Sequence, residues 1–246
     1  MESNHIWKIY SSVLYWGFTW AALVSVSCSR TTPAFCPENS SREACAIVLA
    51  GQRHFASLDT TLSVSKFEAH AVVTGPESEF TTTTYSARDG RARIDQSTGF
   101  TAGTHPEGDW RVDASSGETG PLEREALAYL RGHELHATFL MPERRMLSAE
   151  FVGVTEFEGD SVLAVKYLDP TGSDRFAYYS VADTLPVGML VAGPDPDVIV
   201  TVGRWEQRGP LRLFTSAEFR QGDEVFVYSY RRFSVNDTED EVFEAP

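Results

Sequence analysis

The chain has 246 residues, of which 42% are hydrophobic and 12% aromatic, and this apolar content excludes a wholly disordered protein. Its 35 acidic and 21 basic residues give a formal net charge of −14, which argues against a nucleic-acid partner because phosphate neutralisation requires Lys and Arg. All-β folds of about 200 to 250 residues are often single domains, so we expect one folded domain behind an N-terminal leader.

The leader contains an uncharged run, Ile9–Ser27, that is long enough to cross a bilayer. It fits a cleaved signal peptide, a retained anchor, or a lipoprotein signal in which Cys28 becomes the lipidated first residue. Small residues directly before Cys28 resemble a bacterial lipobox, although Ser25 stands where an aliphatic residue is usual. We therefore predict a signal peptide or N-terminal anchor at residues 1–27, then a lipidated cysteine and polar tether at residues 28–43.

Three cysteines in an exported protein leave an odd one. If Cys28 carries lipid, Cys36 and Cys45 remain as a natural pair, and a disulfide between them would close a short loop where the tether joins the fold. Two unpaired thiols are the alternative.

The folded part begins with a predicted helix. Ser40 or Ser41 can cap it, and an apolar stripe at helical spacing continues to Leu58. We interpret His54, which falls on that stripe, as a histidine at the edge of the core and not as a ligand. Strands separated by turn signals are then predicted at Leu62–Thr74, Ser78–Ala87 and Ala92–Thr98.

The next segment, residues 99–120, is rich in loop-forming residues, with one short strand possible at Asp109–Asp113 and an exposed loop histidine expected at His105. Apolar residues at helical spacing then predict a helix over Leu122–Arg131 and a second short helix within His133–Met141.

The most regular pattern in the chain is a three-stranded antiparallel meander. Apolar and polar residues alternate through Ser148–Phe157, Val162–Leu168 and Arg175–Val181, and Asp169–Gly172 forms a turn. Such a meander needs a partner surface before it is stable. Four more segments, mostly strands, follow at Pro186–Ala192, Asp197–Glu206, Leu211–Gln221 and Glu224–Val235. The sequence thus predicts a mainly β, α+β fold with about ten strands and two or three helices.

The His133-Glu-Leu-His136 segment resembles part of a zinc-hydrolase motif, but that motif needs its second histidine four positions after the first. We interpret the segment as a solvated helix end, and we predict no metal ligand, no cofactor and no catalytic residue. Aspartates such as Asp169 fall at turns, where they cap backbone N–H groups. We therefore expect a protein that is not an enzyme. The alternatives are a metal-dependent hydrolase using His133 and His136, or a ligand-free scaffold or interaction module.

The order of these pieces resembles the LolA/LolB-like superfamily of outer-membrane lipoprotein-sorting proteins, in its uncharacterised lipoprotein branch. The resemblance covers about Ala44–Pro246. Within it, Ala50–Leu58 looks like the first helix leading into a strand, and Tyr85–Ile94 resembles a strand, turn and strand with a basic residue after the turn. Tyr178–Gly188 is similar to a later strand–turn–strand but lacks a glycine of that turn, and Phe233–Pro246 looks like the group's ending.

This resemblance implies that residues 44–246 form a curved antiparallel half-barrel with helices covering its concave face and an apolar cavity that takes acyl chains. The lid would comprise eight apolar residues of the two central helices: Leu122, Leu127, Tyr129, Leu130, Leu135, Phe139, Leu140 and Met141. The alternative is that these side chains simply fill the core.

For function, the resemblance implies a non-catalytic envelope lipoprotein that binds the acyl chains of a lipid or lipoprotein, with a role in transport to the outer membrane. We expect a monomer, held at a membrane by its N-terminus and facing the periplasm.

Overall fold

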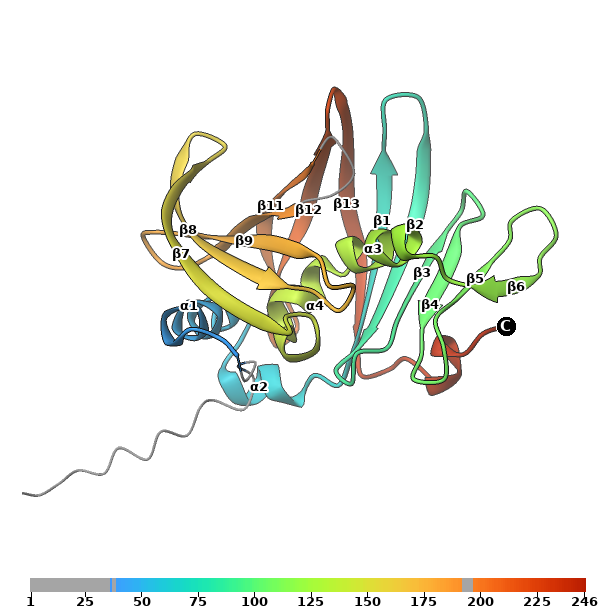
Figure 1. Ribbon diagram of the computed structural model, residues 1–246, viewed down its shortest axis with the longest axis horizontal. Helices are drawn as coiled ribbons and strands as arrows, with labels where there is room; N and C mark the ends of the chain where they lie inside the picture. Colours follow the sequence, from blue (N-terminus) through green and yellow to red (C-terminus); the bar gives the residue numbers. More distant parts are fainter. Residues whose placement is uncertain (1–35, 37–38, 192–196) are drawn as a thin grey trace, which may run out of the picture. The chain divides into compact units, whose positions relative to one another are not determined.

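The computed structural model describes residues 36, 39–191 and 197–246 (Figure 1). The predicted leader at residues 1–27 and the lipidation candidate Cys28 lie outside the described residues. Within the part that is described, no helix combines the length and the apolar character needed to traverse a bilayer.

The fold is dominated by one antiparallel sheet, which contains thirteen strands in the described residues. The strands are β1 (Lys66–Thr74), β2 (Glu79–Ala87), β3 (Ala92–Gln96), β4 (Thr101–Thr104), β5 (Trp110–Val112), β6 (Thr119–Pro121), β7 (Ser148–Phe157), β8 (Asp160–Leu168), β9 (Asp174–Ser180), β10 (Pro186–Val191), β11 (Val198–Arg208), β12 (Leu211–Gln221) and β13 (Glu224–Val235). Their order is β6-β5-β4-β3-β2-β1-β13-β12-β11-β10-β9-β8-β7, so the sheet is open, with β6 and β7 at its two ends. This confirms the predicted mainly β, antiparallel fold.

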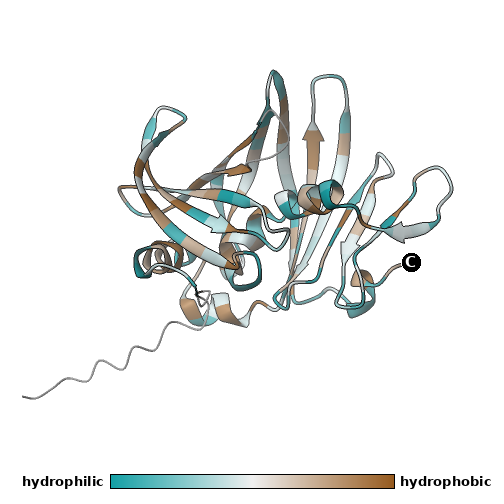
Figure 2. Cartoon of the chain, in the orientation of Figure 1, coloured by the Kyte–Doolittle hydropathy of each residue, from teal (hydrophilic) through white to brown (hydrophobic). Residues whose placement is uncertain are grey.

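The predicted meander is β7–β8–β9. Glu158 and Gly159 connect β7 to β8, and their φ angles of 53° and 86° are the positive pair that a tight type I′ hairpin turn requires. Along the long strands hydrophobic and hydrophilic residues alternate (Figure 2), and in β1 buried residues alternate with half-buried ones. One face of the sheet is therefore available to pack against helices.

The prediction of about ten strands was too low because the segment expected to be mostly loop also forms β4 and β6, beside β5, which falls within the strand considered possible at Asp109–Asp113. These strands have only three or four residues each, too few for an alternating pattern to show. Backbone pairing with neighbouring strands and the side chain of Trp110 hold these strands in place. The Trp110 ring packs directly against Gly103, and a Cβ atom at Gly103 would lie only 2.5 Å from that ring. The indole Nε1 of Trp110 donates to the Phe243 carbonyl at 3.2 Å, which ties the C-terminal 3-10 helix η2 (Asp240–Phe243) to this arm.

The helices also differ from the prediction. The described residues form four α-helices and a second 3-10 helix: α1 (Arg42–Gln52), α2 (Leu58–Ser63), α3 (Arg124–His133), α4 (Leu135–Leu140) and η1 (Pro142–Arg144). The first predicted helix does not run on to Leu58, because Ser57 caps a new helix by accepting a hydrogen bond from the Thr60 amide at 3.3 Å. As a result, the strand predicted from Leu62 begins at Lys66.

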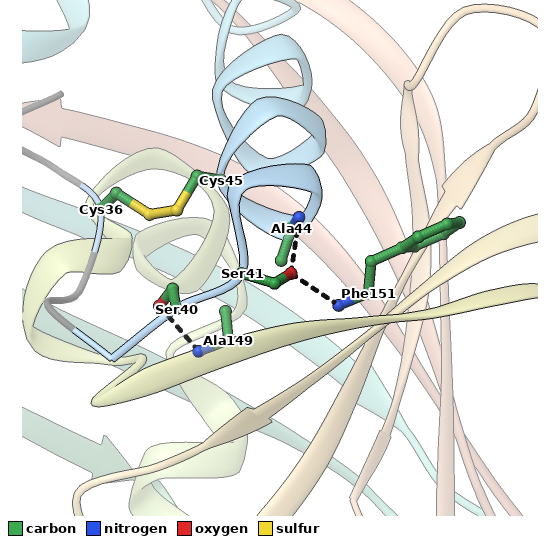
Figure 3. The surroundings of a disulfide bond; sticks show 7 residues. All are labelled: Cys36, Ser40, Ser41, Ala44, Cys45, Ala149 and Phe151. Atoms are coloured by element: carbon green, nitrogen blue, oxygen red, sulfur yellow. Dashed lines mark hydrogen bonds between the residues drawn. A yellow bond between two sulfur atoms is a disulfide. The ribbon is translucent and has the colours of Figure 1, made fainter. Parts of the chain in front are cut away.

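The N-terminal residues of the described fold are attached to the edge strand β7 (Figure 3). The Ser41 hydroxyl accepts hydrogen bonds from the amides of Ala44 and Phe151, so it caps α1 and binds β7 at once. Cys36 and Cys45 form a disulfide with their Cα atoms 5.6 Å apart. The last residues of the predicted tether are thus bonded to the folded part.

Candidate functional site

The two central helices, α3 and α4, lie across one face of the sheet but are packed very differently (Figure 1). All six residues of α4 are buried, and they belong to the segment that enters the main core. In α3 only Leu130, Gly132 and His133 are buried. Helix α4 is therefore an integral part of the core, whereas α3 rests on the β3–β4 arm of the sheet.

The eight predicted lid residues divide between these two environments. Leu135, Phe139, Leu140 and Met141 are at most 1% exposed and join the main core. Leu130 is fully buried in a separate small cluster on the β3–β4 arm, which the half-buried Leu122 also contacts.

The other two residues are less enclosed, since Leu127 is half-buried and Tyr129 is 40% exposed. The structure thus does not place all eight around one hollow. Three hollows in the described part of the chain, at β7–β8, at the α3–α4–β9 junction and at the β2–β3 turn, have none of the eight in their linings.

The sheet surface under α3 carries small or hydroxyl-bearing side chains. Ala92 and Ala102 are fully buried there beside Ile94 and Leu130. The neighbouring strand β2 adds the buried hydroxyls of Thr82, Thr84 and Ser86, and the Thr82 hydroxyl oxygen has no partner among the described residues. We refer to the surface formed by Thr82, Thr84, Ala92, Ile94 and Ala102 as the α3 trough.

The prediction that His133-Glu-Leu-His136 is a solvated helix end was wrong. His133, Glu134 and His136 are 9%, 1% and 3% exposed, because the segment turns from α3 directly into the buried helix α4. No cluster of three His, Cys, Asp or Glu suited to a metal ion occurs among the described residues.

Protein groups bind both ring nitrogens of His133 and Nε2 of His136. The Tyr129 carbonyl, 2.8 Å from Nδ1 of His133, can only accept, so Nδ1 carries the proton and Nε2 accepts from the Tyr228 hydroxyl at 2.7 Å. Nε2 of His136 donates to the Phe214 carbonyl at 2.9 Å, and the two rings stack with centroids 3.7 Å apart. A metal at these histidines would first have to displace such partners.

Burial holds both histidines in the neutral form. Desolvation is the main cause that lowers the pKa of His133 to about 4, with a smaller contribution from the charge of Arg175 and an opposing one from the Tyr129 hydrogen bond. Desolvation likewise lowers the pKa of His136 to about 3, against the hydrogen bond to Phe214. Neither group is poised to exchange a proton near neutral pH.

Between the two histidines, Glu134 is the centre of a buried ion network. Its Oε2 lies 2.5 Å from Nη1 of Arg131, and its Oε1 lies 2.6 Å from Nη2 of Arg145 and accepts from the Ser86 hydroxyl at 2.8 Å. Burial alone would raise the pKa of Glu134, but the charges of Arg145 and Arg131 and the hydrogen bonds outweigh it, so the pKa lies below its usual value. The carboxylate is ionised and fully engaged.

A second buried pair lies beside the first. Nε of Arg175 is 2.6 Å from Oδ2 of Asp169, and these side chains are 1% and 3% exposed. Oδ1 of Asp169 accepts from the amides of Thr171 and Ser173, which confirms the prediction that this aspartate caps a turn. Arg175 also donates from Nη2 to the Ala128 carbonyl at 3.0 Å, so β9 is bonded to α3.

Sequence reasoning missed both ion networks, although one signal was readable. In β9, Arg175 points to the same face of the strand as Ala177 and Tyr179, which are buried. The alternation along the strand therefore already placed the guanidinium of Arg175 on the inner face of the sheet. For Glu134 the sequence showed only that Arg131 stands three residues before it, which gave no sign of burial, because the other partners Ser86 and Arg145 lie 48 and 11 residues away.

Comparison with known proteins adds the fold relationship. No protein-family model matches the chain, and no curated protein matches it. Among solved structures, a LolA superfamily protein from Nitrosomonas europaea has a TM-score of 0.59 at 9% identity, covering 82% of this chain and 97% of that one. The chain has a LolA-like fold.

Two further structures agree with this. A DUF1329 family protein from Desulfovibrio piger has a TM-score of 0.56 at 11% identity, covering 82% of this chain and 97% of its own. A putative outer membrane lipoprotein-sorting protein domain from Vibrio parahaemolyticus has a TM-score of 0.51 at 8% identity, with 80% and 95% coverage. At such low identities the likeness concerns the fold alone.

The neutral buried histidines predict an unusual acid sensitivity. In the unfolded chain both histidines take up a proton near pH 6.5, whereas in the folded chain they stay neutral until the pH is much lower. The free energy of unfolding should therefore fall as the pH drops from about 6.5 towards 4, by up to about 1.4 kcal/mol per pH unit for each histidine. Urea unfolding at a series of pH values measures this slope. His136→Gln keeps an N–H for the Phe214 carbonyl and should remove the share of His136, whereas the control His105→Gln, in the β4–β5 turn, should not. An unchanged slope in His136→Gln would contradict the assignment.

The Glu134 network predicts a large difference between two charge-neutralising changes. Glu134→Gln leaves Arg131 and Arg145 buried without a counter-charge and should lower the free energy of unfolding by about 3–5 kcal/mol. Glu123→Gln is the matched control at the start of α3, since Glu123 pairs with Arg111 while 66% exposed and should change stability little. Chemical denaturation of both variants is the measurement, and equal losses would show that Glu134 has no special role.

Proposed function

We propose that this chain is a non-catalytic envelope protein that binds a lipid acyl chain in the α3 trough, between α3 and strands β2–β4. The observation that carries the proposal is the unequal packing of the two central helices over one face of the sheet. A LolA-like fold, which includes a putative outer membrane lipoprotein-sorting domain among its members, supports it.

Binding exchanges one set of apolar contacts for another. Leu130 and Leu122 would leave Ala92, Ala102 and Ile94, at a cost of about 1.5–3 kcal/mol for each leucine that was fully buried. An acyl chain entering the vacated trough regains about 0.8 kcal/mol for every CH₂ that it buries. A chain of ordinary length can therefore offset the displacement of α3.

The polar contacts that hold α3 on the sheet lie in its C-terminal half, where Arg131 donates to the Gly90 carbonyl and the Thr104 hydroxyl and His133 accepts from the Tyr228 hydroxyl. The Tyr129 hydroxyl accepts from Nε2 of Gln96 at 2.8 Å, and the Ala128 carbonyl accepts from Arg175. In the trough itself, the unpartnered Thr82 hydroxyl can donate to an ester or carboxyl oxygen of the guest.

The proposal gives different roles to the eight residues that sequence analysis grouped together. Leu122, Leu127, Tyr129 and Leu130 form the moving cover. Leu135, Phe139, Leu140 and Met141 form a fixed base, because each is packed into the main core.

We further propose that the chain is an exported monomer, anchored at a membrane through a lipidated Cys28 and facing the periplasm, where it receives or carries the acyl chains of lipids or lipoproteins bound for the outer membrane. The Cys36–Cys45 disulfide supports export, since such bonds persist in oxidising compartments. The hydrolase alternative gains no support from His133 and His136, whose bonded ring nitrogens serve the core.

Palmitate titration followed by native mass spectrometry tests the acyl site. The unaltered chain should bind palmitate one to one. Ala102→Phe fills the trough and should weaken binding by at least about tenfold, whereas Leu130→Ala vacates it and should strengthen binding. Thr83→Phe, on the opposite face of β2, is the control and should bind as the unaltered chain does.

Circular dichroism confirms that each variant is folded. A ligand-free unaltered chain would favour the scaffold alternative, and equal palmitate affinity in Ala102→Phe and Leu130→Ala would place the lipid elsewhere.

A further inference from the structure

A small cavity lies where α3, α4, β8 and β9 meet, away from the α3 trough. Its volume is about 10 Å³, which is room for a single particle the size of a water molecule. Its lining is strongly polar and comprises Arg131, Thr138, Arg145, Tyr167, Asp169, Pro170 and Arg175.

The charges around this cavity do not balance. Arg131, Arg145 and Arg175 bring three guanidinium groups, and the buried carboxylates paired with them are those of Glu134 and Asp169. One positive charge is therefore left over among these five side chains. An uncompensated charge in a buried site is costly, so a counter-ion is favoured there.

Two guanidinium nitrogens beside the cavity also have N–H groups that are available to a ligand. Nη1 of Arg175 and Nε of Arg131 are buried and have no hydrogen-bond partner in the described structure, and the side chains are 1% and 9% exposed. Every other nitrogen of Arg175 is engaged, by Asp169 and by the Ala128 carbonyl. The open donors belong to residues that line the cavity.

We propose that the cavity binds one chloride-sized anion, held by Arg131 and Arg175 with the Thr138 hydroxyl beside them. Such an ion satisfies the open donors and also cancels the residual charge, whereas a water molecule satisfies the donors only. The volume excludes a phosphate or a carboxylate headgroup, and a monatomic anion, which is somewhat larger than water, enters when the lining side chains move slightly apart. Because four elements line the site, occupancy favours the folded state.

The first test is crystallography of the full chain grown in sodium bromide, since bromide scatters anomalously. An anomalous peak in contact with Nη1 of Arg175 is expected. Density for a water molecule without an anomalous peak overturns the proposal, and this measurement does not depend on any variant being folded.

The second test is the melting temperature in sodium chloride and in sodium gluconate at equal ionic strength. Chloride should raise the melting temperature by about 3–5 °C for each tenfold increase above its dissociation constant, and gluconate should not. Arg131→Gln removes the surplus positive charge of these five side chains, so the melting temperature should then respond equally to chloride and to gluconate. Arg144→Gln makes the same charge change at an exposed neighbouring position and should preserve it. An equal response to the two salts in the unaltered chain contradicts the proposal.

Discussion

The packing of the helices depends on one buried carboxylate at the junction of α3 and α4. Glu134 is 1% exposed, and a charge in that position is stable only if cations and hydrogen-bond donors surround it. Arg131 comes from α3, Arg145 from the segment after η1, and Ser86 from β2. Glu134 has φ −77° and ψ 39°, so the chain leaves the α3 helix at this residue and enters α4. The junction is thereby fixed against the sheet.

On either side of this junction the packing differs, and the proposed function follows from the difference. Beyond it, α4 packs against α1, and Gln52 of α1 donates to the Leu140 carbonyl at 3.1 Å inside the core. Before it, α3 rests on the arm formed by β2–β4, where the buried residues are mostly alanines and hydroxyl-bearing side chains. A helix attached at its C-terminal end and lightly packed along its length is suited to admit a guest beneath it.

Much of the fold could be predicted because it rests on local alternation. The strand predicted at Ser148–Phe157 has those bounds in the structure, and the strands from Leu211 and Glu224 begin where the pattern placed them. The short strands β4 and β6 were missed because pairing with their neighbours, not periodicity, defines them, whereas β5 falls within the strand considered possible at Asp109–Asp113. The candidate site was only partly predictable. The apolar residues of α3 and α4 were identified, but their division into two clusters depends on long-range contacts of Leu130 and Glu134 that no local pattern encodes.

Native-state hydrogen exchange tests most directly whether α3 opens while the junction and α4 stay in place. The Leu127 amide bonds to the Glu123 carbonyl within α3, and the Thr138 amide bonds to the Glu134 carbonyl at the start of α4. If α3 leaves the sheet by a local opening, the Leu127 amide should exchange faster than the Thr138 amide by a factor on the order of a hundred. Equal protection of the two amides, lost only on global unfolding, would contradict the account.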